Sequence, residues 1–210
     1  MNNIVLITGA NRGIGLELSR HYSSQGDQVI AVCRETSDEI ENMADLVISG
    51  IDLTHDEAMH TVLQVLKMSH SDDFVIDILI NNAGVLSVRH LADMSDSDLE
   101  RMTTTNLVAP MALTRDLLPA LRASKGRLVN IGSVFGDIAY PFFAGYSATK
   151  FGLRGFSDAM RRELSGAGIG VTYIAPRATR TAAESAFGAL VEPMDMTLDS
   201  AEVVAVQAWD

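Results

Sequence analysis

The sequence predicts an α/β protein with a doubly wound, Rossmann-type parallel sheet and helices on both faces. Short apolar segments rich in β-branched residues recur along the chain, and amphipathic stretches of helical periodicity separate most of them. These segments lack polar alternation, which is typical of strands buried on both faces of a sheet. A glycine-rich loop directly follows the first apolar segment, as in many α/β proteins that bind nucleotides.

Each apolar segment in turn predicts one strand, and the stretches between them predict helices. The expected strands are 3–8, 28–33, 45–49, 75–81, 126–132 and 170–175. The expected helices are 14–24, 55–69, 97–123 and 146–166, and the connection 37–42 is short. No repeat and no linker divides the chain, so we expect a single domain over 1–210.

The C-terminal part of the chain has the least regular pattern. Residues 177–199 mix glycine, proline, methionine and acidic residues, and only 200–209 has the pattern of a helix. We expect 177–199 to form a mobile substrate loop. An ordinary surface tail would have the same composition.

Composition argues against several classes of function. The 16 basic and 27 acidic residues give a net charge of −11, which disfavours nucleic-acid binding and attraction to anionic membranes, although a local site can still bind phosphates. The single cysteine, Cys33, excludes an internal disulfide and a thiolate zinc cluster, and no metal is expected. Neither a signal peptide nor a run of about 20 apolar residues is found, so we expect a cytoplasmic protein.

The loop after the first strand has the features of a pyrophosphate site. Gly9, Gly13 and Gly15 lie between a strand and a helix, where glycine lets the backbone approach a ligand. The N-terminus of the helix favours an anion at the same place. The spacing differs from that of the common Gly-x-Gly-x-x-Gly fingerprint, and a glycine turn without a ligand is the alternative.

The residues after the second strand bear on the choice of cofactor. The common fingerprint has an acidic residue there that binds a ribose 2′-hydroxyl, whereas this chain has Arg34 followed by Glu35. An arginine can pair with the 2′-phosphate of NADP, and Arg12 of the glycine loop can assist. We therefore favour NADP(H) over NAD(H), with Glu35 as the argument against. A solvated surface arginine is the alternative.

Two other strand ends carry polar residues. Asp52 follows the third strand, where it can accept a hydrogen bond from an adenine amino group or cap a helix near Thr54. The stretch 81–84, Asn-Asn-Ala-Gly, follows the fourth strand. Ligands of open α/β sheets bind near this point, where the order of the strands reverses.

A serine, a tyrosine and a lysine together indicate proton-transfer chemistry. Ser133 follows the fifth strand, and Tyr146 and Lys150 lie one helical turn apart. A lysine ammonium and an oxidised nicotinamide would lower the tyrosine pKa from its usual value of about 10. Tyr146 can then exchange a proton with an oxygen that Ser133 holds. Taken singly, Ser133 fits a cap, Tyr146 and Lys150 fit a surface pair, and Asn106 fits an ordinary helical amide.

With these motifs in order, the sequence resembles the short-chain dehydrogenase/reductase family over about residues 3–181. The resemblance rests on Thr8, Gly9, Gly13, Ile14, Gly15, Asp52, Leu53, Asn81, Asn82, Ala83, Gly84, Asn106, Ser133, Tyr146 and Lys150. It implies the strand order 3-2-1-4-5-6. It also implies a catalytic tetrad of Asn106, Ser133, Tyr146 and Lys150, in which Asn106 holds a proton-relay water and Lys150 also binds the nicotinamide ribose.

The resemblance further implies cofactor-binding residues, an activity and an assembly. The cofactor-binding residues are Thr8, Gly9, Asn11, Arg12, Gly13, Ile14, Gly15, Arg34, Asp52, Leu53, Asn82, Ala83, Gly84, Tyr146, Lys150, Pro176, Thr179 and Thr181. Within the family, the sequence most resembles the NADP-dependent carbonyl-reductase branch, which interconverts a ketone or aldehyde with an alcohol. The alternatives are a 3-ketoacyl-thioester reductase and a non-catalytic NADP-binding regulator. We expect a homodimer or homotetramer.

The sequence departs from the family pattern in two places. Arg177 follows Pro176 where the family usually has glycine, and it either alters the loop, reaches an anionic substrate or is simply exposed. No segment corresponds to the seventh strand of the family. Phe135, Phe142, Phe143 and the stretch 194–196 suggest an apolar substrate pocket, although plain core residues would look the same.

Overall fold

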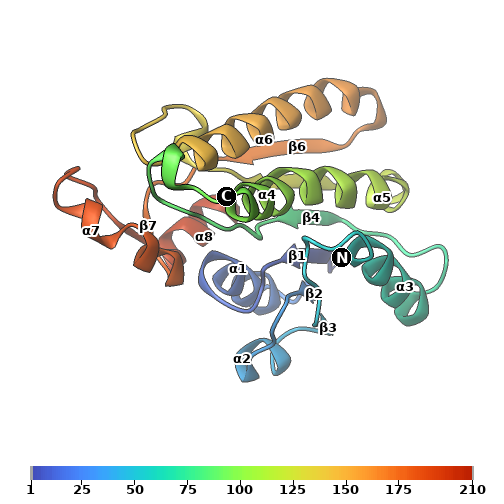
Figure 1. Ribbon diagram of the computed structural model, residues 1–210. Coiled ribbons are helices and arrows are strands. Elements are labelled where there is room, and N and C mark those ends of the chain that lie inside the picture. Colours follow the sequence, from blue (N-terminus) through green and yellow to red (C-terminus); the bar gives the residue numbers. More distant parts are fainter. Residues whose placement is uncertain (1, 210) are drawn as a thin grey trace.

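The sheet has six parallel strands in the order β3-β2-β1-β4-β5-β6, as the sequence predicts. It is described by a computed structural model that covers residues 2–209 (Figure 1). The strands are β1 Ile4–Thr8, β2 Gln28–Val32, β3 Leu46–Ile48, β4 Ile78–Asn81, β5 Arg127–Ile131 and β6 Gly170–Ile174. Each lies within an expected apolar segment and is shorter by up to three residues at an end. All six carboxyl ends therefore meet at one edge of the sheet.

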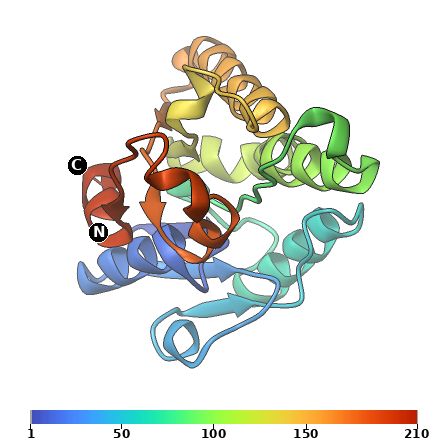
Figure 2. The same cartoon turned by 60° about the vertical axis from the view of Figure 1, so that its left-hand side comes forward.

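Helices cover both faces of the sheet (Figures 1 and 2). On one face lie α3 (Ala58–His70), α5 (Ala109–Ser124) and α6 (Ala144–Glu163), which bury side chains such as Leu66 and Leu113 against the strands. On the other face lie α1 (Gly13–Ser24), α2 (Asp38–Glu41) and α8 (Ala201–Trp209), with Leu18 and Ala205 in the core. The two apolar clusters confirm that the strands are buried on both sides. In the described part of the chain, no helix is long and apolar enough to cross a membrane.

Three helical predictions need correction. The short connection 37–42 contains α2, which begins where the Ser37 hydroxyl accepts a hydrogen bond from the Ile40 amide. Helix α3 begins at Ala58 rather than at 55, because the preceding residues form a turn around Asp52. The expected helix 97–123 is interrupted: α4 (Asp96–Thr103) leads into a π-helical turn, Thr104–Val108, before α5 begins.

The stretch 177–199 contains regular structure rather than a plain loop. Strand β7 (Thr179–Arg180) pairs in parallel with β8 (Asp199–Ser200), and the short helix α7 (Gly188–Val191) lies between them. The pairing holds the two ends of the segment side by side. The mobility expected of this segment stays a prediction.

Candidate active site

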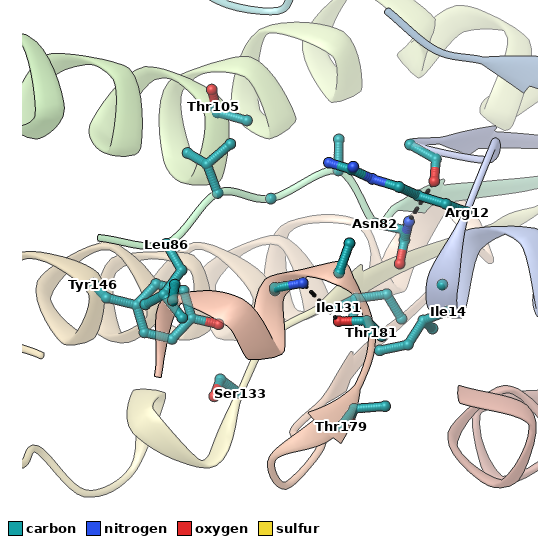
Figure 3. A pocket seen from close by; sticks show the side chains of 18 of the residues that line it. Arg12, Ile14, Asn82, Leu86, Thr105, Ile131, Ser133, Tyr146, Thr179 and Thr181 are labelled. Carbon is teal, nitrogen blue, oxygen red and sulfur yellow. Dashed lines mark hydrogen bonds between the residues drawn. The ribbon is translucent and has the colours of Figure 1, made fainter. Parts of the chain in front are cut away.

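A cavity of about 490 Å³ opens where the carboxyl ends of the strands meet. Its walls come from the glycine loop, the ends of β2 and β3, the residues after β4 and β5, the start of α6 and the segment after β6. Figure 3 shows Tyr146 and Ser133 toward one end of the cavity, and Arg12, Ile14 and Thr181 toward the other.

Most of the site residues expected from the sequence line this cavity. They are Gly9, Asn11, Arg12, Gly13, Ile14, Arg34, Asp52, Leu53, Asn82, Ala83, Gly84, Ser133, Tyr146, Lys150, Pro176, Thr179 and Thr181. The exceptions are Thr8, Gly15 and Asn106, which lie behind its walls. These three residues contact others that line the cavity, and their predicted roles toward a ligand stay predictions.

Thr8 and Gly15 hold together the loops that line the cavity. The Thr8 hydroxyl oxygen accepts hydrogen bonds of 3.1 Å from the backbone amides of Asn82 and Ala83. A Cβ atom on Gly15 would lie 2.3 Å from the Gly9 carbonyl oxygen, so only glycine lets α1 approach the loop this closely. Thr8 and Gly15 thus have a packing role at the site, and the expectation that they bind the cofactor stays a prediction.

The glycine loop requires glycine at two positions because of its backbone. Gly9 and Gly13 have φ angles of 67° and 56°, in the left-handed region that other residues avoid. A Cβ atom on Gly13 would lie 3.2 Å from Cγ2 of Thr181, so the segment after β6 packs directly against the loop. Residues far apart in the sequence thus enclose one end of the cavity.

The charge of the cavity wall is opposite to that of the whole chain. Five basic side chains and two acidic ones line it, whereas the chain carries a net charge of −11. The basic residues are Arg12, Arg34, Arg101, Lys150 and Arg177, and the acidic ones are Glu35 and Asp52. Arg12 and Arg34 are exposed, and neither pairs with a carboxylate among the described residues. The site is therefore suited to an anionic ligand.

Asp52 lines the cavity and also stabilises its own turn. Its carboxylate accepts hydrogen bonds of 3.0 Å from the Thr54 amide and 2.7 Å from the Thr54 hydroxyl. These bonds, together with the nearby His55 and Arg34, lower the pKa of Asp52 despite partial burial. Asp52 does not cap a helix beginning near Thr54, because α3 starts at Ala58.

Tyr146 and Lys150 lie near the start of α6 and do not form a solvated surface pair. Lys150 is only 4% exposed, and its ammonium lies 5.6 Å from the centre of the Tyr146 ring. Lys150 donates a hydrogen bond of 2.9 Å to the carbonyl of Ile131, the dashed bond that ends on Ile131 in Figure 3. That carbonyl is its only hydrogen-bond acceptor among residues 2–209, so two N–H groups remain for a ligand.

Burial shifts the pKa values of these two groups in opposite directions. It lowers the pKa of Lys150 to about 8, because the ammonium is removed from water. Tyr146 remains partly exposed to the cavity, yet the surrounding protein raises its pKa to about 12, and a hydrogen bond with Ser133 offsets part of this rise. In the protein alone, burial therefore moves the Tyr146 pKa in the opposite direction to the one that the sequence suggested for a tyrosine beside Lys150 and an oxidised nicotinamide.

Ser133 both caps a turn and lines the cavity. Its hydroxyl oxygen accepts a hydrogen bond of 3.2 Å from the amide of Phe135, at the start of the turn Val134–Gly136. The same side chain lines the cavity beside Tyr146. The two interpretations of Ser133 left open by the sequence are thus compatible.

Asn106 lies in the π-helical turn and fixes the chain after β4. Its amide oxygen accepts a hydrogen bond of 2.8 Å from the Val85 amide, and its nitrogen donates to the Val85 carbonyl at 2.8 Å and the Thr149 hydroxyl at 3.1 Å. A Cβ atom on Gly84 would lie 3.5 Å from Asn106 Oδ1 and 3.8 Å from Lys150 Nζ, so Asn106 and Lys150 flank Gly84. The structure therefore brings Asn106 next to the site without exposing it there.

Arg177 is held by an ion pair. Its guanidinium donates hydrogen bonds of 3.1 and 2.7 Å to the two carboxylate oxygens of Asp199, at the start of β8. Of the roles considered for Arg177, shaping the loop matches this contact. Arg177 joins the two ends of the 177–199 segment next to the cavity.

The end of the cavity near Tyr146 is apolar. Phe135 and Phe143 stack with ring centres 4.4 Å apart, and Phe187 from the C-terminal segment belongs to the same buried cluster. Leu86 and Met196 complete this part of the wall. The predicted apolar pocket therefore exists, although Phe142 packs beside His90 rather than lining the cavity.

Several residues near the site escaped the sequence analysis, Leu86 of the apolar wall among them. Arg101 and Phe187 line the cavity, and Tyr173 contacts the backbone of Ser133. Phe187 had a weak signal, since it is the only aromatic residue in the stretch 177–199. Arg101 belongs to an ordinary charged helix, and nothing in its surroundings distinguishes it.

The fold and the site define a Rossmann-type α/β protein with a nucleotide-type glycine loop and a Ser–Tyr–Lys group beside it. A family model described as short chain dehydrogenase matches residues 3–189, and the chain belongs to this family.

Individual relatives differ in the substrates that their names give. A 3-amino-tetrahydro-pyrrolizinone reductase of Xenorhabdus hominickii is 30% identical over 177 residues, 84% of this chain and 62% of that protein. The 3-oxoacyl-[acyl-carrier-protein] reductase FabG of Haemophilus influenzae is 34% identical over 178 residues, 82% of this chain and 72% of that protein. The chain thus spans 57 to 62% of the length of the first curated relatives.

Similar solved structures contain either nicotinamide cofactor. A 4-hydroxyisoleucine dehydrogenase complexed with NADH has a TM-score of 0.87 and 29% identity, covering 98% of this chain and 89% of that one. A short-chain dehydrogenase from Sphingobium yanoikuyae in complex with NADPH has a TM-score of 0.83 and 28% identity, covering 99% of this chain and 83% of that one. Family membership therefore leaves the choice of cofactor to the residues of this chain.

Proposed function

We propose that the protein is an NADP(H)-dependent oxidoreductase that interconverts an apolar ketone or aldehyde with its alcohol by hydride transfer. The observation that carries this proposal is the arrangement of Ser133, Tyr146 and the Lys150 ammonium in one cavity, which Arg12, toward its other end, and Arg34 also line. This arrangement supports the activity of the carbonyl-reductase branch that the sequence resembles.

The residues of the cavity fit a nicotinamide dinucleotide. The glycine loop presents the N-terminus of α1 to a pyrophosphate, and the two free N–H groups of Lys150 suit ribose hydroxyls. Bound there, the nicotinamide would supply or accept the hydride. Tyr146, with a pKa of about 12, is protonated at neutral pH and can donate its proton to a forming alkoxide, while Ser133 holds the same oxygen.

The charge of the bound cofactor has a role in the reverse direction. Since the protein alone raises the Tyr146 pKa, we propose that the positive charge of the oxidised nicotinamide is needed to make Tyr146 a base for alcohol oxidation. Asn106 is proposed to act by holding the chain at Val85, next to Gly84 and Lys150. A proton-relay water at Asn106 remains part of this proposal.

The preference for NADP(H) rests on two arginines. Arg34 and Arg12 line the cavity and are available for a 2′-phosphate, whereas NAD(H)-binding sites favour an acidic residue at this place. Glu35 also lines the cavity and opposes this preference.

A second candidate substrate class is a 3-ketoacyl thioester. The observation that favours it is the relation to the FabG protein of Haemophilus influenzae. A thioester reductase should act on acetoacetyl thioesters and leave simple aldehydes unreduced. An enzyme for apolar carbonyl compounds should show the opposite order.

Turnover by the purified protein tests the proposal. Wild type should oxidise NADPH with apolar ketones or aldehydes, and Tyr146→Phe should lose at least about 100-fold in kcat, the usual contribution of one general acid. Tyr140→Phe is the control, because Tyr140 does not line the cavity. If Tyr146→Phe matches wild type, the proposal is wrong. If calorimetry shows NADPH binding but no substrate is turned over, the result would instead indicate the non-catalytic NADP-binding regulator.

A further inference from the structure

We propose that Tyr173 of β6 is a positioning residue that fixes Ser133 relative to Tyr146. This inference rests on the proposed function, since it assigns a role within the same site. Tyr173 does not line the cavity, and its hydroxyl acts on the backbone behind the cavity wall.

The Tyr173 hydroxyl lies among three backbone groups from two elements. It accepts a hydrogen bond of 3.4 Å from the Ser133 amide and lies 3.3 Å from the Ser133 carbonyl and 3.5 Å from the Lys150 carbonyl, both of which it can donate to. A hydroxyl has one proton, so it donates to one carbonyl at a time. Through this single group β6 is tied to the turn that carries Ser133 and to the helix that carries Tyr146 and Lys150.

Two glycines leave the space that Tyr173 fills. A Cβ atom on Gly132 would lie 2.1 to 2.3 Å from three atoms of the Tyr173 side chain, and one on Gly136 would lie 2.2 Å from its hydroxyl. Neither glycine has a positive φ angle, so the backbone conformation does not require glycine at 132 or 136. The space for Tyr173 does require it, which indicates that this contact is specifically built.

The contact matters because the local hydrogen bonds of Ser133, to the amides of Phe135 and Gly136, hold it only within its own turn and do not tie it to α6. Its backbone is extended, with φ −171° and ψ 156°, a conformation open to any residue. Ser133 follows β5, whereas Tyr146 is on α6, so their separation depends on what joins these two elements. The Lys150 ammonium joins α6 to Ile131 at the end of β5. The Tyr173 hydroxyl adds a contact to Ser133 itself and to the Lys150 carbonyl, which helps to fix the distance between Ser133 and Tyr146.

A double-mutant cycle tests whether Tyr173 acts through Ser133. Tyr173→Phe keeps the ring and removes only the hydroxyl, and should lower kcat for carbonyl reduction roughly tenfold with the KM for NADPH unchanged. In a Ser133→Ala background the same change should have no further effect. Equal losses in both backgrounds, or no loss in either, would overturn the proposal. Tyr140→Phe keeps the ring that packs against Phe135 and removes a hydroxyl from a residue that does not line the cavity, so it should behave as wild type.

Hydrogen exchange tests the contact without any turnover. The Ser133 amide should exchange faster in Tyr173→Phe, while the Val129 amide in β5 keeps its wild-type rate. An unchanged Ser133 rate would refute the role of Tyr173 even if the enzyme is active. If wild type turns over no carbonyl compound, the proposed function is wrong. The exchange rate of the Ser133 amide still shows whether the Tyr173 hydroxyl holds Ser133. Gly132→Ala, which displaces the Tyr173 ring, gives a second route to the same faster exchange.

Discussion

Arg34, at the tip of β2, should discriminate between the two nicotinamide cofactors. It is exposed at the cavity and unpaired with any carboxylate among the described residues, so a 2′-phosphate would be its main partner. Arg34→Ala should raise the KM for NADPH about 10- to 100-fold, as expected for a lost charged hydrogen bond, and leave that for NADH nearly unchanged. Initial-rate kinetics with both cofactors measure this. Arg122→Ala on α5 is the control, and equal losses with NADPH and NADH would contradict the assignment.

Lys150 should make stability depend on pH in an unusual direction. Its pKa is about 8 in the folded protein against 10.5 ordinarily, so between these values the unfolded chain binds the proton more tightly. The free energy of unfolding should therefore gain about 1.4 kcal/mol per pH unit from Lys150 in that window. Urea unfolding of wild type and Lys150→Met at pH 8, 9 and 10 measures this effect. The free energy of unfolding of wild type should rise with pH relative to that of Lys150→Met.

The matched control for this experiment is Lys67→Met on α3. Lys67 is solvent-exposed and pairs only with exposed Asp72, so its variant should follow the wild-type pH profile. A Lys150→Met profile parallel to wild type would show that Lys150 titrates normally.

The sequence predicts well which residues lie at the strand ends. It does not predict which of them line the cavity and which of them hold the neighbouring loops. The spacing of Tyr146 and Lys150 places them on one helix face, and the structure confirms that they adjoin. Thr8 and Asn106 occupy expected motif positions but turn their side chains to the backbone of neighbouring loops. Such contacts join residues more than 20 positions apart, and no local pattern encodes them.

At the scale of elements, the ion pair between Arg177 and Asp199 should hold the C-terminal segment in place. It closes the segment where β7 and β8 pair over only two residues each. Arg177→Ala should make residues 181–198 more sensitive to limited proteolysis, and Asp199→Ala should do the same. The double variant should be no worse than either single one, because both remove one interaction. Fully additive effects would show that the two residues act separately.

The π-helical turn shows which part of an element the sequence does not predict. The apolar periodicity of 97–123 indicates one helix, and both α4 and α5 follow it. The inserted turn depends on Asn106 bonding to Val85 and Thr149, which are distant in the sequence. A tertiary contact therefore overrides the helical pattern at the residue nearest the site.

For the whole molecule, we propose association through α5 and α6. Met111 on α5, Phe151 on α6 and Val108, just before α5, are large exposed apolar side chains. Covering them would gain roughly 25 cal/mol for each Å² buried. Met111→Glu and Phe151→Glu should each shift the protein toward the monomer in size-exclusion chromatography with light scattering. Met68→Glu, on α3, should not. A wild-type monomer at all concentrations would contradict the proposal.

The fold as a whole could be predicted because its signals are local and repeated. Six apolar segments, each too short for a helix, fix the number of strands, and their connections allow only a parallel sheet. The C-terminal segment could not be predicted in the same way. The positions of Phe187 and Arg177 depend on contacts with residues distant in the sequence, the apolar cluster for Phe187 and Asp199 for Arg177.

The pairing of β7 with β8 has a consequence for engineering. Its register joins Thr179 to Asp199 and Arg180 to Ser200, so the segment between the two strands begins and ends at almost the same point. Because the entropy of closing a loop grows only slowly with its length, exposed residues of this segment could be exchanged or added at little cost in folding, whereas Phe187 has to keep its place in the buried cluster. Residues 181–198 are thus a segment whose exposed positions can be changed to alter the proposed substrate preference while the rest of the fold stays the same.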